Sequence, residues 1–463
     1  SGGRPTRTSS VARPEHTIIE RVPHAVPGTV KPMEDPLSNS LVRVGLLGCG
    51  NVGAALAVLV AEQRDDVARR TGLAFEVASV AVRDTAIDRG VPLPAEVFTT
   101  DAAAIVADPD IDVVVEVMGG IEPARELIVA ALENGKPVVT ANKELLARHG
   151  AELYSIAEAA GVDLLFEAAV AGAIPIMRPL RESFAGEPIT RVMGIINGTT
   201  NFILTKMSEE GAAYADALAE AQRLGYAEAD PTADVEGHDA GAKVAIIATL
   251  AFGAEVVADD VYLEGISRVT AADIEAAAHL GHCIKLLAVA ERRGDEIGVR
   301  VHPTLVPNDH PLAAVNDSFN AVFVEGDAVG EVMLYGRGAG GRPTASAVFG
   351  DLIDAAANNA RGHGASFGSL ERARISPMAD LETAYYLAVD VDDRPGVLAG
   401  VAAVFGDHSV SIRSMEQSGL GGEARLVFIT HRARESDVQA TLHDLRNLDA
   451  VRNVGSVLRA LGD

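Results

Sequence analysis

Two lysines stand in settings where an ammonium group could do acid–base chemistry, and the first is Lys243. It follows Asp239 by four residues in HDAGAKVAIIATLAF, a segment apolar on nearly every face, which predicts a buried helix. Residues four apart share a helix face, so these side chains are expected to form an ion pair. On an exposed face the pair would be unremarkable, but charges opening a buried helix are costly to leave unpaired. Burial can also lower a lysine pKa towards neutrality, so Lys243 is a candidate proton donor or acceptor.

The second lysine is Lys143, in the segment VVTANKELL, where a predicted strand ends and a helix begins. An ammonium group in the first turn of a helix faces the positive end of the helix dipole, which is locally unfavourable. The plain alternative is a surface lysine that the helix tolerates. The residue type and position alone leave both interpretations open.

Acidic residues crowd the segment before Lys243, where Glu228, Asp230, Asp234 and Glu236 predict a polar patch in an apolar setting. Their spacing does not match an EF-hand loop, because no glutamate stands at its final position. His238 has no second histidine at ligand spacing, so a structural role is favoured over metal binding. The patch therefore favours substrate or proton chemistry over a metal centre.

A glycine pattern follows the first predicted strand, in the segment VRVGLLGCGNVG. Gly48 permits a tight turn, Gly50 lets a pyrophosphate approach the backbone, and Gly53 lets the next helix pack on the strand. Asn51 and Val52 open that helix, whose free N–H groups suit phosphates. The spacing alone is weak evidence, but the apolar strand before it and the Ala/Leu/Val helix after it predict a dinucleotide site.

The end of the second predicted strand, VAVRD, bears on which dinucleotide binds. An acidic residue here would hold the ribose hydroxyls of NAD, whereas an arginine would suit the 2′-phosphate of NADP. Arg83 and Asp84 offer both neighbours. We favour Arg83 and NADP, with NAD and a solvated strand end as the alternatives.

The composition excludes several partners. The formal net charge of −26, from 65 acidic and 39 basic side chains in 463 residues, disfavours nucleic acid and anionic lipid. No apolar run approaches the roughly 20 residues needed to span a bilayer. The two cysteines, Cys49 and Cys283, do not organise a disulfide framework, which fits a reducing compartment, so a cytoplasmic protein is expected.

The elements that must position these residues alternate between strands and helices in the first part of the chain, which predicts a parallel sheet with right-handed crossovers. From Ile174 to about Asp317 the sequence predicts rising helical content, and Ala321–Tyr335 is strand-rich. Residues 383–460 are predicted to form a βαββαβ unit of ferredoxin-like order. The predicted domains are a disordered leader (1–40), a dinucleotide-binding domain (41–165 plus 335–360), a substrate and dimerisation domain (166–334), a linker (361–380) and a regulatory domain (381–463).

Taken together, these segments identify a family. The chain resembles bacterial homoserine dehydrogenases along nearly its whole length after residue 40. The shared stretches are GLLGCGNVG (45–53), VVEVMGG (114–120), VVTANKELLA (138–147), FEAAVAGAIPI (166–176), GIINGTTNFIL (194–204), GYAEADPTADVEGHDAGAK (225–243) and YGRGAGGRPTASAV (335–348). The resemblance implies an α/β protein with a Rossmann-type dinucleotide-binding domain, an α+β substrate domain and a C-terminal ferredoxin-like ACT domain.

The resemblance also implies an activity, the NAD(P)-dependent interconversion of L-homoserine and L-aspartate 4-semialdehyde in the biosynthesis of threonine, methionine and isoleucine. Lys243 would then be the acid–base residue at the terminal oxygen of the substrate, Lys143 would lie beside that oxygen and the nicotinamide, and Asp239 would orient the lysine. Glu228 and Asp234 would hold the amino end of the substrate. These roles answer a chemical need, since an alcohol that loses a hydride must also lose its proton.

Further sites come from the resemblance alone. It implies additional cofactor contacts at Gly119, Lys143 and Gly340. It also implies a monovalent cation, usually sodium, bound mostly by backbone carbonyls. The matching positions are Glu167, Val170, Gly172 and Ile174.

The C-terminal unit resembles an ACT domain in the motif DRPGVL, between its first strand and first helix. ACT domains bind amino acids, and the free N–H groups of a helix start suit a carboxylate. The candidate effector residues are Asp393, Pro395, Gly396 and Val397, and L-threonine is the expected effector. Sheet pairing through such domains is compatible with a homodimer or a homotetramer.

Two rival functions remain for comparison. An aldehyde-oxidising dehydrogenase needs a cysteine thiolate, but Cys49 lies inside the phosphate loop and Cys283 in a predicted helical run, HLGHCIKLL. A non-catalytic amino-acid sensor with the same domains would be expected to have lost Lys143 or Lys243, and both are present. A dehydrogenase acting on an alcohol is therefore favoured.

Overall fold

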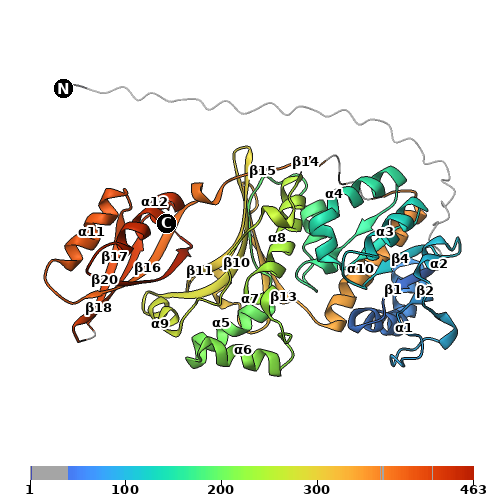
Figure 1. Cartoon of the computed structure of the whole chain (residues 1–463). Helices are drawn as coiled ribbons and strands as arrows, with labels where there is room; N and C mark the ends of the chain where they lie inside the picture. Colours follow the sequence, from blue (N-terminus) through green and yellow to red (C-terminus); the bar gives the residue numbers. More distant parts are fainter. Residues whose placement is uncertain (1, 3–39, 365–366, 368–369, 420, 463) are drawn as a thin grey trace.

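The computed structural model describes residues 2, 40–364, 367, 370–419 and 421–462. Almost all of the predicted leader, residues 1–40, thus lies outside the described residues. Three bodies follow one another across the molecule, with the dinucleotide-binding sheet at one end, a larger sheet and its helices in the middle, and the C-terminal unit at the other end (Figure 1).

The first body is built on a parallel sheet whose strand order, over the described residues, is β3-β2-β1-β4-β5-β6. The strands are β1 (Ser40–Leu47), β2 (Leu73–Ala81), β3 (Phe98–Thr99), β4 (Val113–Glu116), β5 (Val138–Thr140) and β6 (Leu164–Leu165). The helices of this region are α1 (Asn51–Thr71), α2 (Ala102–Ala107), α3 (Ala124–Glu133) and α4 (Lys143–Ala160). The order reverses between β1 and β4, and such a switch point opens a crevice at the carboxyl ends of the strands.

A helix from far along the chain completes this body. Helix α10 (Gly341–Ala360) buries Val348 and Leu352 in the same apolar cluster as Leu56 and Val60 of α1. Phe349 also meets Phe75 of β2 edge to face, with 5.7 Å between ring centroids. The predicted Rossmann-type fold is confirmed, and the chain returns to it after passing through the middle body.

The middle body places helices on an antiparallel sheet. Its strands are β7 (Ile189–Ile195), β10 (His282–Arg293), β11 (Glu296–Pro307), β12 (Phe319–Gly326) and β13 (Gly330–Arg337). Its helices are α5 (Gly198–Glu210), α6 (Tyr214–Arg223), α7 (Thr232–Val235), α8 (His238–Phe252) and α9 (Ala271–His279). Helix α8 is buried along almost its whole length, as its apolar composition predicts, and packs against β10 and β11.

Between residues 174 and 317, where rising helical content was predicted, the chain also contains the long strands β7, β10 and β11, and the prediction of a helical run around Cys283 was wrong. The segment around Cys283 is strand β10, which pairs in register with β11 over its whole length and with β7 over residues 288–291. Most of β10 is buried, from Ile284 to Ala290. A continuous apolar run covered on both faces carries no alternation, so its pattern does not distinguish a strand from a buried helix.

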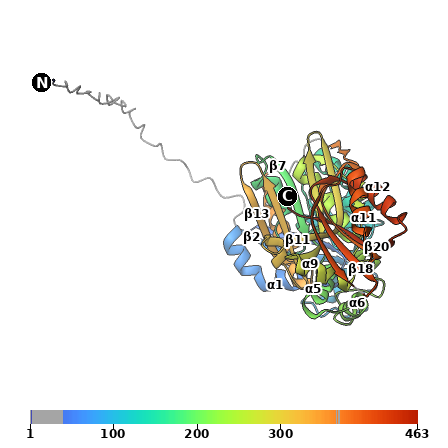
Figure 2. The same ribbon diagram turned by 90° about the vertical axis from the view of Figure 1, so that its left-hand side faces the viewer.

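The C-terminal unit has the predicted βαββαβ order. It comprises β16 (Glu382–Asp392), α11 (Val397–Asp407), β17 (Ile412–Gly419), β18 (Glu423–Thr430), β19 (Ala433–Arg434), α12 (Glu435–Arg446) and β20 (Val451–Ala460). Helices α11 and α12 pack together on one face of its sheet, as the turned view shows (Figure 2). Residues Tyr385, Phe405 and Phe428 lie at the centre of this core.

The middle sheet and the C-terminal sheet are continuous. Strand β20 pairs in parallel with the end of β11, so the described residues form one 12-stranded sheet across both bodies. The predicted linker region contributes short strands, β14 (Glu371–Arg372) and β15 (Arg374–Ile375), which pair with β8 (Ala254–Glu255) and β11. Another short strand, β9 (Tyr262–Leu263), also lies against β11. In the part of the chain that the structure describes, no helix has the length and apolar character to cross a membrane.

Candidate active site

Asp239 lies between the ammonium groups of the candidate lysines. Lys143 Nζ is 2.9 Å from Oδ1 of Asp239, and Lys243 Nζ is 2.7 Å from Oδ2. Lys143 opens α4 of the dinucleotide-binding body, whereas Asp239 and Lys243 belong to α8 of the middle body. The cluster therefore joins both bodies at a single carboxylate.

Helix α8 explains the local arrangement. Gly237 caps its N-terminus with a φ of 86°, in the left-handed region that favours glycine. Asp239 then lies in the first turn, where the helix dipole favours a carboxylate, and Lys243 lies one turn further on the same face. Lys243 Nζ also donates a 2.8 Å hydrogen bond to the carbonyl oxygen of Ile196.

The charges of this cluster depend on one another. Burial by itself would raise the pKa of Asp239, but the adjacent ammonium groups of Lys243 and Lys143 outweigh it and hold that pKa well below its usual range. Burial lowers the pKa of Lys143, but the Asp239 carboxylate outweighs this and raises it overall. Asp239 is therefore an anion and Lys143 a cation at neutral pH.

Asn197 completes the cluster and was not predicted as a site residue. Its Nδ2 donates to Asp234 Oδ1 at 2.6 Å and to Asp239 Oδ2 at 2.9 Å. Its Oδ1 accepts from the backbone N–H of Thr200, so the same side chain caps α5. Asn before Gly-Thr-Thr is a helix-cap signal in the sequence, but that signal does not reveal what the other end of the amide contacts.

Asp234 lies near this cluster, as predicted for a polar patch. Its pKa is raised, first because the carboxyl is half-buried and also because Asp239 is close, although the Asn197 hydrogen bond acts in the opposite direction. Glu228 is exposed on the loop before α7. The role predicted for Glu228 in substrate binding stays a prediction.

The segment that carries Lys143 is tied to the loop after β4. Asn142 Nδ2 donates a 2.6 Å hydrogen bond to the carbonyl of Gly120, and Asn142 also caps α4. The fully buried carboxylate of Glu116 accepts from the backbone N–H groups of Met118 and Gly119 and from Thr140 Oγ1. Glu116 thus shapes the loop that contains Gly119, a role that sequence reasoning missed.

The glycine loop after β1 adjoins that loop. Gly48 has a φ of 100°, and a Cβ there would lie 2.9 Å from the carbonyl oxygen of Val117. A Cβ at Gly53 would overlap the carbonyl oxygen of Gly48, so close packing of helix on strand requires glycine there. A Cβ at Gly50 would meet open space, which leaves room for a ligand beside the start of α1. Residues at these positions fit a dinucleotide pyrophosphate.

The cysteines do not offer a thiolate nucleophile. Burial raises the pKa of Cys49, which lies within the glycine loop, and that of Cys283 on β10. A thiol with a raised pKa is a poor nucleophile at neutral pH. This argues against the aldehyde-oxidising dehydrogenase considered as a rival.

Comparisons with known proteins identify the family of this chain. Residues 48–167 match the NAD-binding domain model of homoserine dehydrogenase, residues 175–353 match the homoserine dehydrogenase model, and residues 385–450 match the ACT domain model. The homoserine dehydrogenase of Corynebacterium glutamicum is 54% identical over 91% of this chain and 96% of its own. The chain belongs to the homoserine dehydrogenase family. It is therefore an oxidoreductase with an NAD-binding domain, a catalytic domain and an ACT domain.

Solved homoserine dehydrogenases have the same fold. The crystal structure from Thiobacillus denitrificans is 44% identical, covers 91% of this chain and 98% of its own, and superposes with a TM-score of 0.86. A hyperthermophilic archaeal homoserine dehydrogenase, solved in complex with NADPH, is 32% identical, covers 68% of this chain and 97% of its own, and has a TM-score of 0.59. The shorter coverage of the archaeal protein leaves about a third of this homoserine dehydrogenase unmatched.

Other predicted cofactor residues flank the glycine loop of the enzyme. Arg83 and Asp84 are exposed just after β2, and Asp84 accepts from the backbone N–H of Ala86. Gly340 caps α10 with a φ of 117°, and a Cβ at the next residue, Gly341, would lie 3.0 Å from the carbonyl oxygen of Asn51. The predicted second cofactor loop thus adjoins the start of α1.

In the predicted cation segment, the side chain of Glu167 is held by hydrogen bonds from the protein itself. The carboxylate of Glu167 accepts hydrogen bonds from the backbone N–H groups of Ile176, Met177 and Arg178. A cation there would therefore rely on backbone carbonyls, including those of Val170, Gly172 and Ile174. Ala171 and Gly172 have φ values of 55° and 58°. The backbone therefore turns here, and its carbonyl groups do not alternate in direction as they would along a strand. The described residues contain no group of three or more His, Cys, Asp or Glu side chains placed to hold a metal.

The ACT loop presents a helix N-terminus. Gly396 caps α11 with a φ of 90°, and glycine has no side chain that could accept a hydrogen bond from the first N–H groups of that helix. The predicted effector residues around it are Asp393, Pro395, Gly396 and Val397.

Proposed function

We propose that the enzyme interconverts L-homoserine and L-aspartate 4-semialdehyde with NADP as the preferred cofactor, and that L-threonine regulates it through the ACT domain. The observation that carries the proposal is the meeting of Lys143, Asp239 and Lys243 between the cofactor-binding body and the middle body. A carbinol held at that junction would have a proton acceptor on one side and the cofactor on the other.

The proposed chemistry divides between the cofactor and the protein. The bound nicotinamide supplies hydride transfer to or from the carbon that carries the terminal oxygen. In the oxidation, the amine of Lys243 accepts the hydroxyl proton, and in the reduction its ammonium returns the proton. Lys143 stabilises negative charge on the same oxygen, and Asp239 holds both lysines in position.

The remaining residues bind and orient. Asp234 of α7 and Glu228 on the loop before it are proposed to hold the substrate ammonium, because their carboxylates complement its charge. A pyrophosphate is proposed to lie at Gly48, Gly50, Asn51, Val52 and Gly53, with further contacts from Gly119 and Gly340. A monovalent cation, sodium in this proposal, would support the turn from Glu167 to Ile174 without entering the reaction.

The preference for NADP rests on Arg83. Arg83→Ala should weaken NADPH binding about tenfold, since a charge-assisted contact to a phosphate contributes about 1.5–3 kcal/mol, and should leave NADH nearly unaffected. Fluorescence titration of both cofactors measures this directly, with Arg64→Ala, an exposed arginine of α1, as the control. Equal losses for both cofactors would exclude Arg83 as the 2′-phosphate ligand.

The activity itself is tested by a spectrophotometric assay of NAD(P)H formation from L-homoserine, with and without L-threonine. Turnover that threonine suppresses supports both the reaction and a working ACT domain. A rate of turnover that is the same with and without threonine supports the reaction but excludes threonine as the effector. No turnover with either cofactor, in folded protein supplied with sodium or potassium, would overturn the proposal.

Assembly and location complete the proposal. We expect a homodimer or homotetramer in the cytoplasm, with neither nucleic acid nor membrane as a partner. Exposed apolar side chains on the edge strand β13, Met333 and Tyr335, support a self-association surface there. Light scattering on the purified protein measures the oligomeric state.

A further inference from the structure

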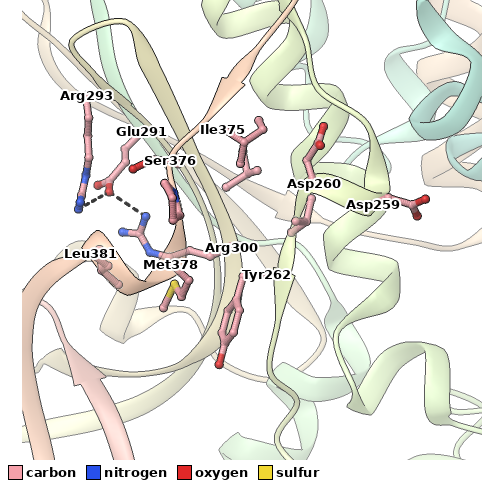
Figure 3. Close-up of a pocket in the computed structure, with 14 residues that line it drawn as sticks. Asp259, Asp260, Tyr262, Glu291, Arg293, Arg300, Ile375, Ser376, Met378 and Leu381 are labelled. Carbon is pink, nitrogen blue, oxygen red and sulfur yellow. Dashed lines mark hydrogen bonds and ion pairs between the residues drawn. The ribbon is translucent and has the colours of Figure 1, made fainter. Parts of the chain in front are cut away.

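A cavity of about 300 Å³ lies where the middle body, the segment after α10 and the start of the ACT domain meet (Figure 3). Its polar side is formed by Glu291 and Arg293 of β10 and Arg300 of β11, and Ser376 contributes from the opposite wall. Ile375, Met378 and Leu381 give it an apolar side. It is separate from the lysine–aspartate cluster, none of whose residues line it.

The charged side chains of this cavity are of both signs and lie on different sides of it. Asp259 and Asp260 line one side, where Asp260 pairs with Arg372, whereas Arg293 and Arg300 line the other side (Figure 3). Arg293 and Arg300 both pair with Glu291 Oε1, at 2.5 and 2.8 Å. A smaller cavity of about 50 Å³ adjoins it across the same residues. Among the residues that the structure describes, the smaller cavity is lined by five arginines against Glu291 and Glu382. These arginines are Arg191, Arg293, Arg300, Arg432 and Arg459.

One N–H group of the Arg300 guanidinium makes no hydrogen bond to the described part of the protein. Its side chain is only 10% exposed, and its Nε is buried without a hydrogen-bond partner in the described part of the chain. Nε2 of His302, two residues along the same face of β11, is likewise buried and unpartnered. Buried polar side-chain atoms in native proteins nearly always have a partner from protein, water or ligand, so these atoms, of which His302 Nε2 lies at the smaller cavity, point to an occupant.

We propose that this junction cavity binds a small organic carboxylate, distinct from any ligand of the ACT loop at Gly396. A guanidinium group pairs with a carboxylate through parallel N–H donors, which matches the free edge of Arg300. The apolar wall of Ile375, Met378 and Leu381 favours an organic molecule over bare phosphate. The volume suits a molecule the size of an amino acid or a short dicarboxylic acid.

Strand β11 connects the cavity with the catalytic helix. Arg300 faces the cavity, and since neighbours on a strand face opposite ways, Val301 faces α8. Cγ1 of Val301 lies 3.1 Å from where a Cβ of Gly237 would stand, and Gly237 caps the helix of Asp239 and Lys243. A ligand that moves β11 therefore acts on the N-terminus of α8.

Binding is measured by isothermal titration of the full-length protein, first with L-threonine and succinate, then with further amino acids and di- and tricarboxylic acids, and with inorganic phosphate. Arg300→Lys keeps the charge but loses the planar fork. Ser376→Glu places a carboxylate in the cavity. Ser155→Glu, at an exposed position of α4, is the charge-matched control. We expect a carboxylate to bind wild type and the control, and to bind both cavity variants at least tenfold more weakly.

The outcomes separate the sources. Binding by amino acids alone assigns a zwitterion, and binding by succinate or its relatives assigns an organic acid. Binding of phosphate but of no carboxylate overturns the inference, as does the absence of carboxylate binding. Threonine binding that survives both cavity variants but is lost in Val397→Asp would place threonine at the ACT loop, which overturns the inference and leaves the proposed function standing. If Arg300→Lys fails to fold, the carboxylate affinity of Ser376→Glu is the test of the inference.

A kinetic readout tests the connection through β11. A carboxylate that binds the cavity should change the KM for L-homoserine at least threefold in wild type and in Ser155→Glu. The same addition should have no effect in Ser376→Glu. A change that is equal in all of these proteins would mean that the ligand acts elsewhere, and the inference would fall.

Discussion

The charge cluster at the active site and the one at the ACT junction have opposite designs. At the active site, the carboxylate of Asp239 lies between the ammonium groups of Lys143 and Lys243. At the junction with the ACT domain, the guanidinium of Arg459 on β20 lies between the carboxylates of Glu435 on α12 and Glu264, which follows β9. Each cluster joins two bodies, so both have a structural role in common.

The difference between them lies in the residue types. Lysine can give up its proton at accessible pH, whereas arginine remains charged in proteins. Burial alone would lower the pKa of Arg459, but Glu435 and Glu264 outweigh it and raise that pKa further. Arg459 also binds Glu435 through Nε and Nη2, at 3.0 and 2.9 Å. The active-site cluster is thus suited to proton transfer and the junction cluster to holding domains together.

The sharpest test of this contrast is Lys243→Ala. Because it removes the proposed acid–base group, kcat should fall about 10³-fold, within the range for general acid–base residues, while cofactor affinity stays nearly intact. Steady-state kinetics and cofactor titration measure both. Lys206→Ala, which removes a surface ion pair with Glu210, is the control and should leave kcat unchanged. Lost cofactor binding with modest loss of kcat would contradict the assigned role.

A substitution in the junction cluster should lower the stability of the fold and leave catalysis nearly unchanged. Glu435→Gln leaves the buried Arg459 partly unpaired, so the free energy of unfolding should fall by about 3 kcal/mol, while kcat at low temperature changes less than about twofold. Urea denaturation measures the loss. Glu62→Gln, which breaks a surface pair with Arg342, is the control and should leave the free energy of unfolding nearly unchanged. A catalytic loss without a stability loss would reverse the distinction.

Asp239→Asn tests whether the central carboxylate positions and tunes the lysines. Since Asp239 raises the pKa of Lys143, its loss should lower that pKa and move the alkaline limb of the kcat profile to lower pH. We expect kcat at neutral pH to fall about tenfold, below the range for a residue that itself transfers the proton. A purely structural role would lower kcat equally at every pH without moving the profile.

The smallest expected effect is on stability against acid. The folded-state pKa of Asp239 lies below its unfolded value, so its ion pairs stabilise the protein above about pH 4 and lose this contribution as the pH falls further. The difference in unfolding free energy between wild type and Asp239→Asn should therefore be largest near neutrality and shrink below pH 4. A difference that grows as the pH falls would mean that Asp239 is not held as an anion.

Local signals in the sequence were reliable guides. The glycine loop could be predicted because the turn, phosphate approach and helix packing each demand a small residue within a few positions. The pair of Asp239 and Lys243 could be predicted because residues four apart share a helix face, and the structure places them 2.7 Å apart. The ACT unit could be predicted from the alternation of its strands and its loop motif.

Contacts between distant segments were beyond such reasoning. From the sequence alone, Lys143 could equally have been a surface residue. Only the contact between α4 and α8 shows that it pairs with Asp239. The cap signal of Asn197 gave no indication that its amide also bridges Asp234 and Asp239. Strand β10 was mistaken for helix because its burial comes from β7, β11 and the layers on either side.

The sequence by itself therefore determined the fold class, the cofactor loop and the chemistry available to the lysines, because these depend on residue types at short spacing. The tertiary structure decided which charged side chains pair with one another, that the ACT sheet continues the middle sheet through β11 and β20, and that arginines gather around the smaller cavity beside the junction cavity. Such features depend on the packing of elements far apart in the chain, and no local pattern encodes which buried charge will find which partner.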